Sequence, residues 1–209
     1  MSCPVERLLG EIRACRVCVD APQGAPLPHE PNPVLRVHSG ARIAVVGQAP
    51  GTRVHTTSIP FNDPSGERLR AWMGVSRDEF YDGRRIAIVP MGFCFPGLDA
   101  KGGDLPPRKE CAPRWRERVF SHLTRLELVL VIGAYAQRWH LGAGAKRTLT
   151  ETVRNWHGYA PYYVPLPHPS WRNNSWLNKN SWFEAEVLPF VKQRVRALLD
   201  EAPEAPRTG

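Results

Sequence analysis

Four of the five cysteines form a pattern that limits how this chain can fold. Cys15 and Cys18 lie in one Cys-Arg-Val-Cys segment, whereas Cys94 and Cys111 come much later in the chain. Two ligands on one tight turn can chelate a metal, but the fold must bring in the two remote ligands, so metal binding and folding are coupled. Zinc held by four thiolates and a four-cysteine iron-sulfur cluster both fit the count. Cys3 is assigned no role.

Disulfide bonds are the weaker interpretation of these cysteines. The segment Met-Ser-Cys-Pro-Val-Glu-Arg is not a basic region followed by an apolar stretch, so we expect no export to an oxidising compartment. No run approaches the ~20 apolar residues that a membrane-spanning helix needs. We therefore expect a cytoplasmic protein, in the bacterial cytosol or nucleoid, without a membrane partner.

The charge balance points to a polyanionic partner. The 209 residues include 28 Lys and Arg against 20 Asp and Glu, a formal net charge of +8. The basic residues are interspersed through 101–125 and 172–196 rather than gathered in a tail, which favours a basic face on a folded domain. An ordinary solvated surface with a positive excess is the plain alternative.

Four short apolar runs organise the chain, at residues 42–47, 86–90, 128–133 and 162–166. They are rich in β-branched residues and too short for buried helices, so they predict parallel strands covered on both faces. Helical patterns lie between them, at 4–14, 66–73, 108–126 and 134–141, with a Ser76-x-x-Glu79 capping box. This alternation predicts an α/β fold: a three-layer α/β/α arrangement with a central four-stranded parallel sheet.

The chain is predicted to form a single domain over residues 1–200, with an N-terminal metal-binding segment and a flexible tail at 201–209. A last helix should begin at Asn180 or Ser181, and Pro189 should kink or split it.

The residues that follow the predicted strands matter most for function. In an open parallel sheet, ligands bind outside the carboxyl ends of the strands. Those ends carry Gly47-Gln-Ala-Pro-Gly51, Pro90-Met-Gly-Phe-Cys94, Gly133-Ala-Tyr135 and Pro167-His-Pro-Ser170. Neither the phosphate-loop pattern nor the Gly-x-Gly-x-x-Gly dinucleotide pattern occurs, so neither nucleotide class is supported.

Three of these segments resemble the motifs of the uracil-DNA glycosylase superfamily. They are residues 47–51, 60–66 (Pro-Phe-Asn-Asp-Pro-Ser-Gly) and 166–174 (Leu-Pro-His-Pro-Ser-Trp-Arg-Asn-Asn). The resemblance runs from about Cys15 to Leu199. The cysteines sit where the iron-sulfur branch, families 4 and 5, places its cluster ligands, and residues 104–111 are similar to that branch's approach to the fourth cysteine.

The resemblance implies a [4Fe-4S] cluster on Cys15, Cys18, Cys94 and Cys111, with a structural role. It also implies a monomeric hydrolase acting on N-glycosyl bonds, a monofunctional DNA glycosylase of base excision repair. Such an enzyme flips a deaminated base out of DNA, uracil being the first candidate, and leaves an abasic site. The alternative is a non-catalytic iron-sulfur or zinc module that binds damaged or single-stranded DNA.

The chemistry of the reaction assigns roles to the motif residues. Breaking the glycosidic bond leaves positive charge on the sugar and negative charge on uracil, so we expect His168 to stabilise the anion. Asp63 is the carboxylate expected to orient the attacking water or to offset the positive charge on the sugar. Gln48 is the further catalytic candidate. The predicted base-binding residues are Phe61, as the stacking face, with Gly47, Gln48, Ala49, Asn62 and Phe93. The predicted DNA-binding residues are Ser65, Gly66, Ser170, Trp171, Arg172 and Asn173.

Each assignment has a plain structural alternative. Phe61 could be a core aromatic of its loop, and His168 could only orient its turn. Asp63 could cap a helix without any catalytic role. Trp171 could be buried packing instead of a wedge in the vacated space, and Arg172 a simple phosphate contact.

The sequence departs from the best-known branch at several motif positions. That branch has a water-activating Asp and a thymine-excluding Tyr at the positions of Ala49 and Gly51, and family 4 commonly has Glu at Gln48. The Asn that reads uracil in families 1 and 4 would fall near Pro90, which has no side-chain donor. Base selectivity is therefore left open between uracil, hypoxanthine and xanthine.

Overall fold

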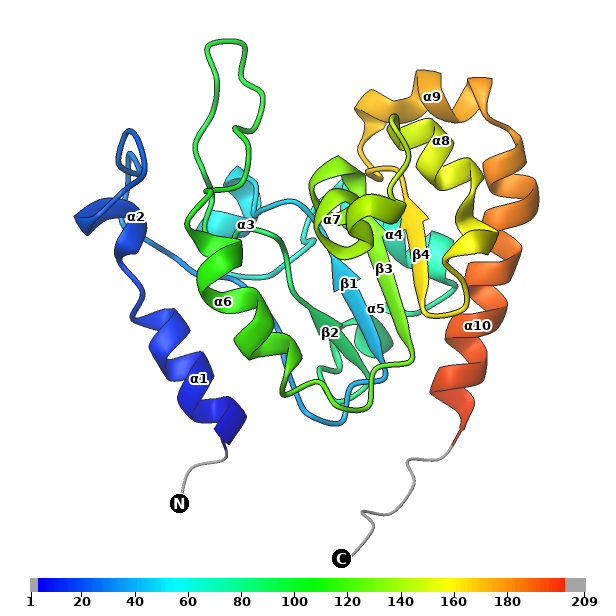
Figure 1. The fold of residues 1–209 in the computed structure, drawn as a ribbon, viewed down its shortest axis with the longest axis horizontal. Coiled ribbons are helices and arrows are strands. Elements are labelled where there is room, and N and C mark those ends of the chain that lie inside the picture. Colours follow the sequence, from blue (N-terminus) through cyan, green and yellow to red (C-terminus); the bar gives the residue numbers. More distant parts are fainter. Residues whose placement is uncertain (1–3, 202–209) are drawn as a thin grey trace, which may run out of the picture.

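Four short apolar strands form the centre of the computed structural model, which describes residues 4–201. The strands are all parallel and lie in the order β2-β1-β3-β4. Their bounds are β1 Ile43–Val46, β2 Ile86–Ile88, β3 Leu128–Ile132 and β4 Tyr163–Leu166. The predicted parallel sheet is therefore confirmed, and β1 and β3 lie at its middle (Figure 1).

Helices connect and cover the strands. They are α1 Pro4–Arg13, α2 Val17–Asp20, α3 Thr52–Thr57, α4 Pro64–Met73, α5 Arg77–Tyr81, α6 Cys111–Phe120, α7 Gly133–Leu141, α8 Leu149–Arg154, α9 Asn174–Lys179 and α10 Leu188–Asp200. The 3-10 turns are η1 Gly142–Gly144, η2 Trp156–Gly158 and η3 Trp171–Asn173, and η4 Phe183–Val187 is a π-helix.

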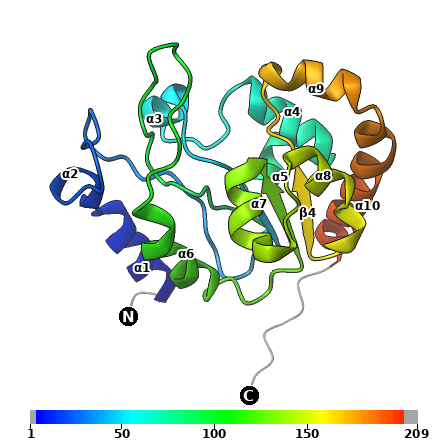
Figure 2. The ribbon, with the colours of Figure 1, turned by 45° about the horizontal axis from the view of Figure 1, so that its top comes forward.

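Alternate residues of the strands face two separate hydrophobic clusters, which makes three layers. Ile43 and Val45 of β1 pack with residues from α4, α5, α8 and α10 on one face. Ala44 and Val46 pack on the other face with residues from α1, α6 and α7. All four residues of β1 are buried, as expected for a strand covered on both sides. The predicted α/β/α layering is confirmed (Figure 2).

Several helix boundaries differ from the predicted ones. The helix predicted over 108–126 is α6, which ends at Phe120; Leu123 nevertheless lies in the core from the loop that follows. Helices α2, α3, α8 and α9 have four to six residues each and were not predicted from the sequence. Helices this short show too little periodicity to stand out in the sequence.

The last helix is interrupted as its proline predicts. The π-helix η4 runs directly into α10, and Pro189 occupies the first turn of α10, where it lacks an N–H to donate. Neither Asn180 nor Ser181 caps it through a side chain; the residue before η4 is Trp182. Within residues 4–201, no helix is long and apolar enough to cross a membrane. Cys3 and most of the predicted tail lie outside the described residues.

The capping box at the start of α5 contains a glutamate that also pairs with the last helix, α10. The Ser76 hydroxyl accepts the Glu79 N–H, and the Glu79 carboxylate accepts the Ser76 N–H, as the sequence predicted. Arg196 of α10 donates to Glu79 Oε1 at 2.9 Å. The hydrogen bond from Arg196 is the largest cause that lowers the pKa of Glu79 to about 2. Glu79 thus links α5 to α10 across the layer.

We expect Glu79→Gln to lower the free energy of unfolding by about 1 kcal/mol at pH 7, because a partly exposed ion pair contributes little more than this. The lowered pKa means that the stabilisation is present above the ordinary Glu pKa and is lost as pH falls towards 2. Urea unfolding at pH 7 and pH 3 measures both effects. Glu151→Gln, in the capping box of α8, is the matched control, because Gln preserves the box and Glu151 has no arginine partner in residues 4–201. An equal loss in both variants at pH 7 would contradict the ion-pair argument.

Candidate active site at the carboxyl edge of the sheet

Two adjoining hollows open at the carboxyl ends of the strands. The inner hollow spans about 540 Å³, part of which is open to solvent. It is lined by Val34, Gly47, Gln48, Ala49, Pro50, Gly51, Val54, Pro60, Phe61, Asp63, Ser65, Ile88, Pro90, Asp104 and His168. The outer hollow shares Gln48, Ala49, Asp63, Ser65, Asp104 and His168 with it and continues to residues 170–173. The three motif segments therefore meet at one place. Of the four strand-end segments expected at this edge, 47–51 and 167–170 contribute to the hollows and Pro90 lines the inner one, whereas residues 133–135 line neither.

The segment before α4 holds Phe61 in an unusual backbone conformation. Phe61 has φ +52°, and the Tyr81 hydroxyl donates to the Pro60 carbonyl at 2.8 Å and to the Phe61 carbonyl at 3.3 Å. A Cβ atom on Gly66 would lie 1.8 Å from the Phe61 carbonyl oxygen, so only glycine fits at that position. Tertiary contacts thus impose the left-handed conformation of Phe61.

The Phe61 ring lies against the first motif. A Cβ atom on Gly47 would lie 3.1 Å from its Cζ atom, and the ring meets Phe80 edge-on with centroids 6.1 Å apart. Phe61 is half-buried and also contacts the larger hydrophobic cluster. The ring therefore packs on the core through one part of its surface and borders the inner hollow with another. A planar base entering this hollow would find an aromatic neighbour already fixed.

Asp63 caps helix α4. Its Oδ1 atom accepts the Gly66 N–H at 2.9 Å, which is the arrangement of an N-cap aspartate. The plain alternative for Asp63 thus holds as a description of the local structure, while the residue also lines both hollows. The Gly66 N–H is already engaged by this cap and does not point freely at a ligand.

His168 follows β4 and borders both hollows. The Ser170 N–H lies 3.2 Å from Nδ1, so Nδ1 accepts and the proton of the neutral ring belongs on Nε2. The Asn173 side chain donates to the His168 carbonyl at 2.7 Å and fixes the same turn. Burial is the largest influence on the His168 pKa and lowers it, although Asp63 and Asp104 oppose that effect. The ring is held as a neutral hydrogen-bond donor at neutral pH.

Asp104 is the acidic residue at this site that the sequence analysis missed. It lies in the loop between β2 and α6, outside the three motif segments, yet it lines both hollows. Its carboxylate approaches Gly51, where a Cβ atom would lie 3.5 Å from Oδ2. Its position in the long loop gave no periodic signal; only the resemblance of residues 104–111 to a loop in one branch pointed to this segment.

The predicted DNA-contacting residues lie on the outer hollow. Ser65, Ser170, Trp171, Arg172 and Asn173 line it together with Lys101. Trp171 is 70% exposed, the largest exposure of any large hydrophobic residue described, and the Arg172 guanidinium lies 5.6 Å from its ring centre. Buried packing is thus excluded for Trp171 in the free protein.

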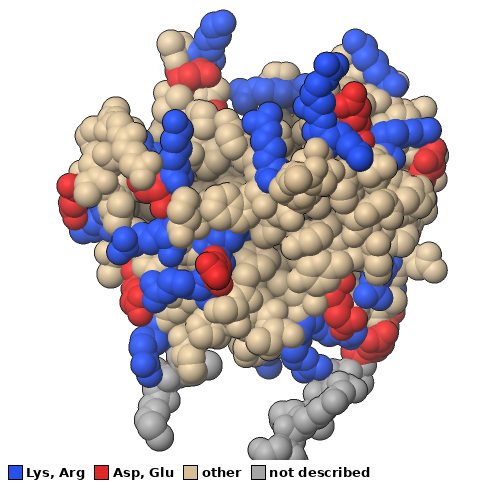
Figure 3. All heavy atoms as spheres, in the orientation of Figure 1, with Lys and Arg blue, Asp and Glu red and all other residues tan. Residues whose placement is uncertain are grey.

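Basic side chains surround this edge of the sheet. Figure 3 shows Lys and Arg residues projecting along the top of the molecule, above the carboxyl ends of the strands. Arg68 of α4 donates to the Ser170 carbonyl at 3.2 Å and so ties the second motif segment to the third. The edge offers the positive charge that a phosphate backbone requires.

Two predicted base contacts lie elsewhere. Asn62 lines neither hollow, and its Oδ1 atom accepts from Arg77 at 3.4 Å. Phe93 is buried among the cysteines, because its backbone turns away from the sheet edge after β2. Gly47, Gln48 and Ala49 do line the inner hollow. Gln48 also donates to the Leu105 carbonyl at 3.5 Å, so its amide faces the loop that carries Asp104.

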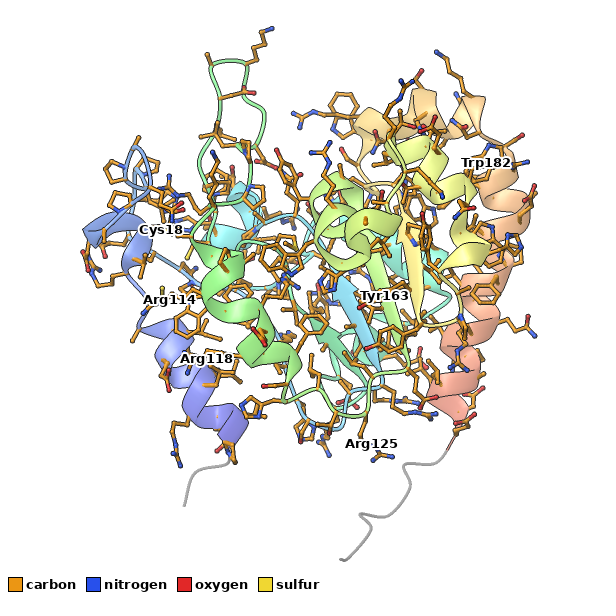
Figure 4. All side chains as sticks on the ribbon, in the orientation of Figure 1. Cys18, Arg114, Arg118, Arg125, Tyr163 and Trp182 are labelled. Carbon is orange, nitrogen blue, oxygen red and sulfur yellow. The ribbon has the colours of Figure 1, made fainter. Side chains whose placement is uncertain are left out.

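The four patterned cysteines meet at a second location. Cys15, Cys18, Cys94 and Cys111 are free thiols and line one hollow of about 410 Å³ between the N-terminal segment and α6. Figure 4 labels Cys18, a residue of α2, on the side towards α6. Burial raises the pKa of Cys94 and of Cys111 to about 12. The Phe93 N–H donates to Cys111 Sγ at 3.3 Å.

Within residues 4–201, no group of three or more His, Cys, Asp or Glu side chains is arranged to hold a single metal ion. Tetrahedral zinc needs four donors about 2.0–2.3 Å from one point. In a cluster each thiolate binds a different iron, so the sulfurs surround a larger volume. Four thiols around one hollow, with an N–H donor directed at one sulfur, fit an iron-sulfur cluster chemically. The cluster itself is still a prediction.

Comparison with known families agrees with the geometry of the edge. The model of the uracil DNA glycosylase superfamily matches residues 36–192, which include all four strands and the three motif segments. The match leaves Cys15 and Cys18 outside it and does not address the iron-sulfur branch. Three quarters of the chain lies within the match, and the chain therefore belongs to the uracil-DNA glycosylase superfamily.

Proposed function

We propose that this protein is a monofunctional DNA glycosylase that flips a deaminated base, uracil first, into the inner hollow and hydrolyses its glycosidic bond. One observation carries the proposal: a fixed aromatic ring, a neutral histidine and two carboxylates border the same hollow. Membership of the superfamily supports glycosylase-type chemistry on DNA.

His168 stabilises the departing base. When the C1′–N1 bond breaks, the electron pair goes to the base, and negative charge develops on uracil O2. A neutral imidazole whose Nε2 carries the proton can donate a hydrogen bond to that oxygen without taking up a second proton. The lowered pKa keeps the ring neutral below the ordinary histidine pKa, so this donor persists at mildly acidic pH.

Binding of the DNA strand is the task of the outer hollow. Trp171 is exposed beside the site and is suited to fill the space that a flipped nucleotide leaves. Arg172 and Lys101 supply positive charge for the flanking phosphates. The proposed product is an abasic site, because no lysine lines the inner hollow to attack the sugar.

We also propose that the four cysteines hold a [4Fe-4S] cluster with a structural role. Neutral thiols with raised pKa values are poor metal ligands, but bound iron lowers thiol pKa values and replaces the protons. The cluster would supply cross-links between the N-terminal segment, the loop after β2 and the start of α6. Base hydrolysis needs no electron transfer.

His168→Ala should reduce single-turnover cleavage of a uracil-containing oligonucleotide by ~10²-fold or more, because the uracil anion loses its preorganised donor. The measurement uses enzyme excess, and affinity for the uncleaved DNA should change little. His157→Ala, at an exposed histidine of η2 outside both hollows, is the matched control. A His168→Ala rate within threefold of the parent would refute this role. A parent that turns over no deaminated base would support the non-catalytic DNA-binding alternative instead.

The cluster predicts brown protein with broad visible absorption and about four iron atoms per chain after anaerobic purification. Cys111→Ala should lose iron and lower the melting temperature, because the ligand sets close long loops. Cys3→Ala removes the cysteine outside the pattern and should retain full iron content. Colourless parent protein with stoichiometric zinc would show that the prediction is wrong.

Base discrimination should be broader than in a pocket with an asparagine at its floor. Val34, Val54, Ile88 and Pro90 give the inner wall an apolar part, and Gln48 is the one carboxamide among its lining residues. Without an asparagine at the floor, backbone groups must supply more of the hydrogen bonds to base edges, and they tolerate several bases. We therefore expect slow cleavage of hypoxanthine or xanthine at high enzyme concentration, measured against uracil in the same oligonucleotide. Strict uracil specificity would count against this prediction.

A further inference from the structure

We propose that Asp104, and not Asp63, is the carboxylate that takes the proton of the attacking water. This inference rests on the proposed glycosylase function. It assigns a catalytic role to a residue outside all three motif segments.

The backbone of Asp104 is held in a fixed position. Residues 97–105 form a hairpin in which Leu98 and Asp104 make an antiparallel bridge. The Asp99 N–H donates to the Gly103 carbonyl at 2.8 Å, and the Leu105 N–H to the Gly97 carbonyl at 3.0 Å. At the turn, Asp99 Oδ1 accepts the N–H groups of Lys101 and Gly103. Asp104 thus lies at the base of an ordered hairpin that rises beside α3 (Figures 1 and 2).

The two carboxylates at the site differ in what they already bind. Asp63 Oδ1 is occupied by the Gly66 N–H, and this cap begins α4. For the Asp104 carboxylate, residues 4–201 supply no hydrogen-bond donor. A general base needs a free lone pair for its water: Asp63 keeps one at Oδ2 but is held to the helix through Oδ1, whereas both oxygens of Asp104 are without a donor from the described residues.

The charged neighbours of Asp104 suit a base. Partial loss of solvent around the carboxylate is the largest influence and raises its pKa, although the residue as a whole stays exposed. Arg172 and His168 lower the pKa, while Asp63 and Asp99 raise it further. A carboxylate with a raised pKa accepts a proton more readily than an ordinary aspartate does.

Gly51 makes room for this arrangement. A Cβ atom at residue 51 would already be in van der Waals contact with Asp104, and a longer side chain would compete for the space of the carboxylate. Gln48 donates to the carbonyl of Leu105, the residue after Asp104, and lines the same two hollows. The first motif supplies no acidic residue, since it has only Gln48, Ala49 and Gly51 at these positions. The hairpin supplies one instead.

The proposed step balances as a hydrolysis. The C1′–N1 bond breaks with its electron pair going to the base, which His168 stabilises as an anion. The water oxygen forms a bond to C1′, and its proton passes to the Asp104 carboxylate and then to solvent. The base takes a proton from solvent after release, so no further reactant is required.

The test compares single-turnover rates and pH profiles under enzyme excess on one uracil-containing oligonucleotide. Asp104→Asn should lower the rate by ~50-fold or more, and Asp104→Glu should restore part of it. The parent rate should fall as pH drops through the raised Asp104 pKa, and Asp104→Asn should lose this acidic limb of the pH–rate profile.

Asp63→Asn should lower the single-turnover rate by less than tenfold and keep the acidic limb, because Asn also caps helices. Asp78→Asn, on the exposed side of α5, should match the parent.

Two readouts separate a catalytic role from a structural one. Iron content and affinity for an oligonucleotide carrying 2′-fluoro-deoxyuridine, which resists cleavage, should be unchanged in Asp104→Asn. An Asp104→Asn rate within threefold of an active parent, or a pH limb that is lost only in Asp63→Asn, would overturn the assignment and leave the proposed function standing. A parent that cleaves neither uracil, hypoxanthine nor xanthine would overturn both.

Discussion

The close contact between the Phe61 carbonyl and Gly66 is the constraint on which the site depends. Glycine is required at residue 66 because the carbonyl occupies the space of a Cβ atom. The same carbonyl accepts from Tyr81, which fixes the left-handed backbone of Phe61 and places its ring against Gly47. The Asp63 cap then starts α4 immediately beyond this turn. One short segment, residues 61–66, therefore sets the position of the Phe61 ring, the start of α4 and the contact with Gly47.

The cysteine hollow and the sheet edge are joined by a single loop. Cys94 stands at the beginning of the loop between β2 and α6, and Cys111 is the first residue of α6. Asp104 and Lys101 lie between them. A group bound by both cysteines would hold both ends of the loop, so that the hairpin could keep its place beside Gly51 without a hydrophobic core of its own. The proposed cluster would thus affect the geometry of the site directly without any redox task.

The sequence predicted the sheet and the shared edge of its strand-end segments because both depend on local patterns. Four apolar runs of β-branched residues fixed the strands, and parallel strands bring their carboxyl ends to one edge. Phe93 and Asn62 were misplaced because adjacency in sequence does not say which way a loop turns. Likewise α6 proved shorter than predicted, since Leu123 reaches the core from a loop and mimics a helical position.

Asp104 escaped the sequence analysis for a different reason. Its proposed role depends on the absence of a side chain at Gly51, about fifty positions earlier, and on a hairpin closed by backbone hydrogen bonds. Neither fact is visible as a periodic pattern or a motif. When the motif 47–51 is considered alone, the absence of its acidic residue suggests a loss of catalytic activity. In the folded chain the glycine leaves space, and a carboxylate from another loop enters it, so the charge needed at the sugar can be supplied from outside the motif.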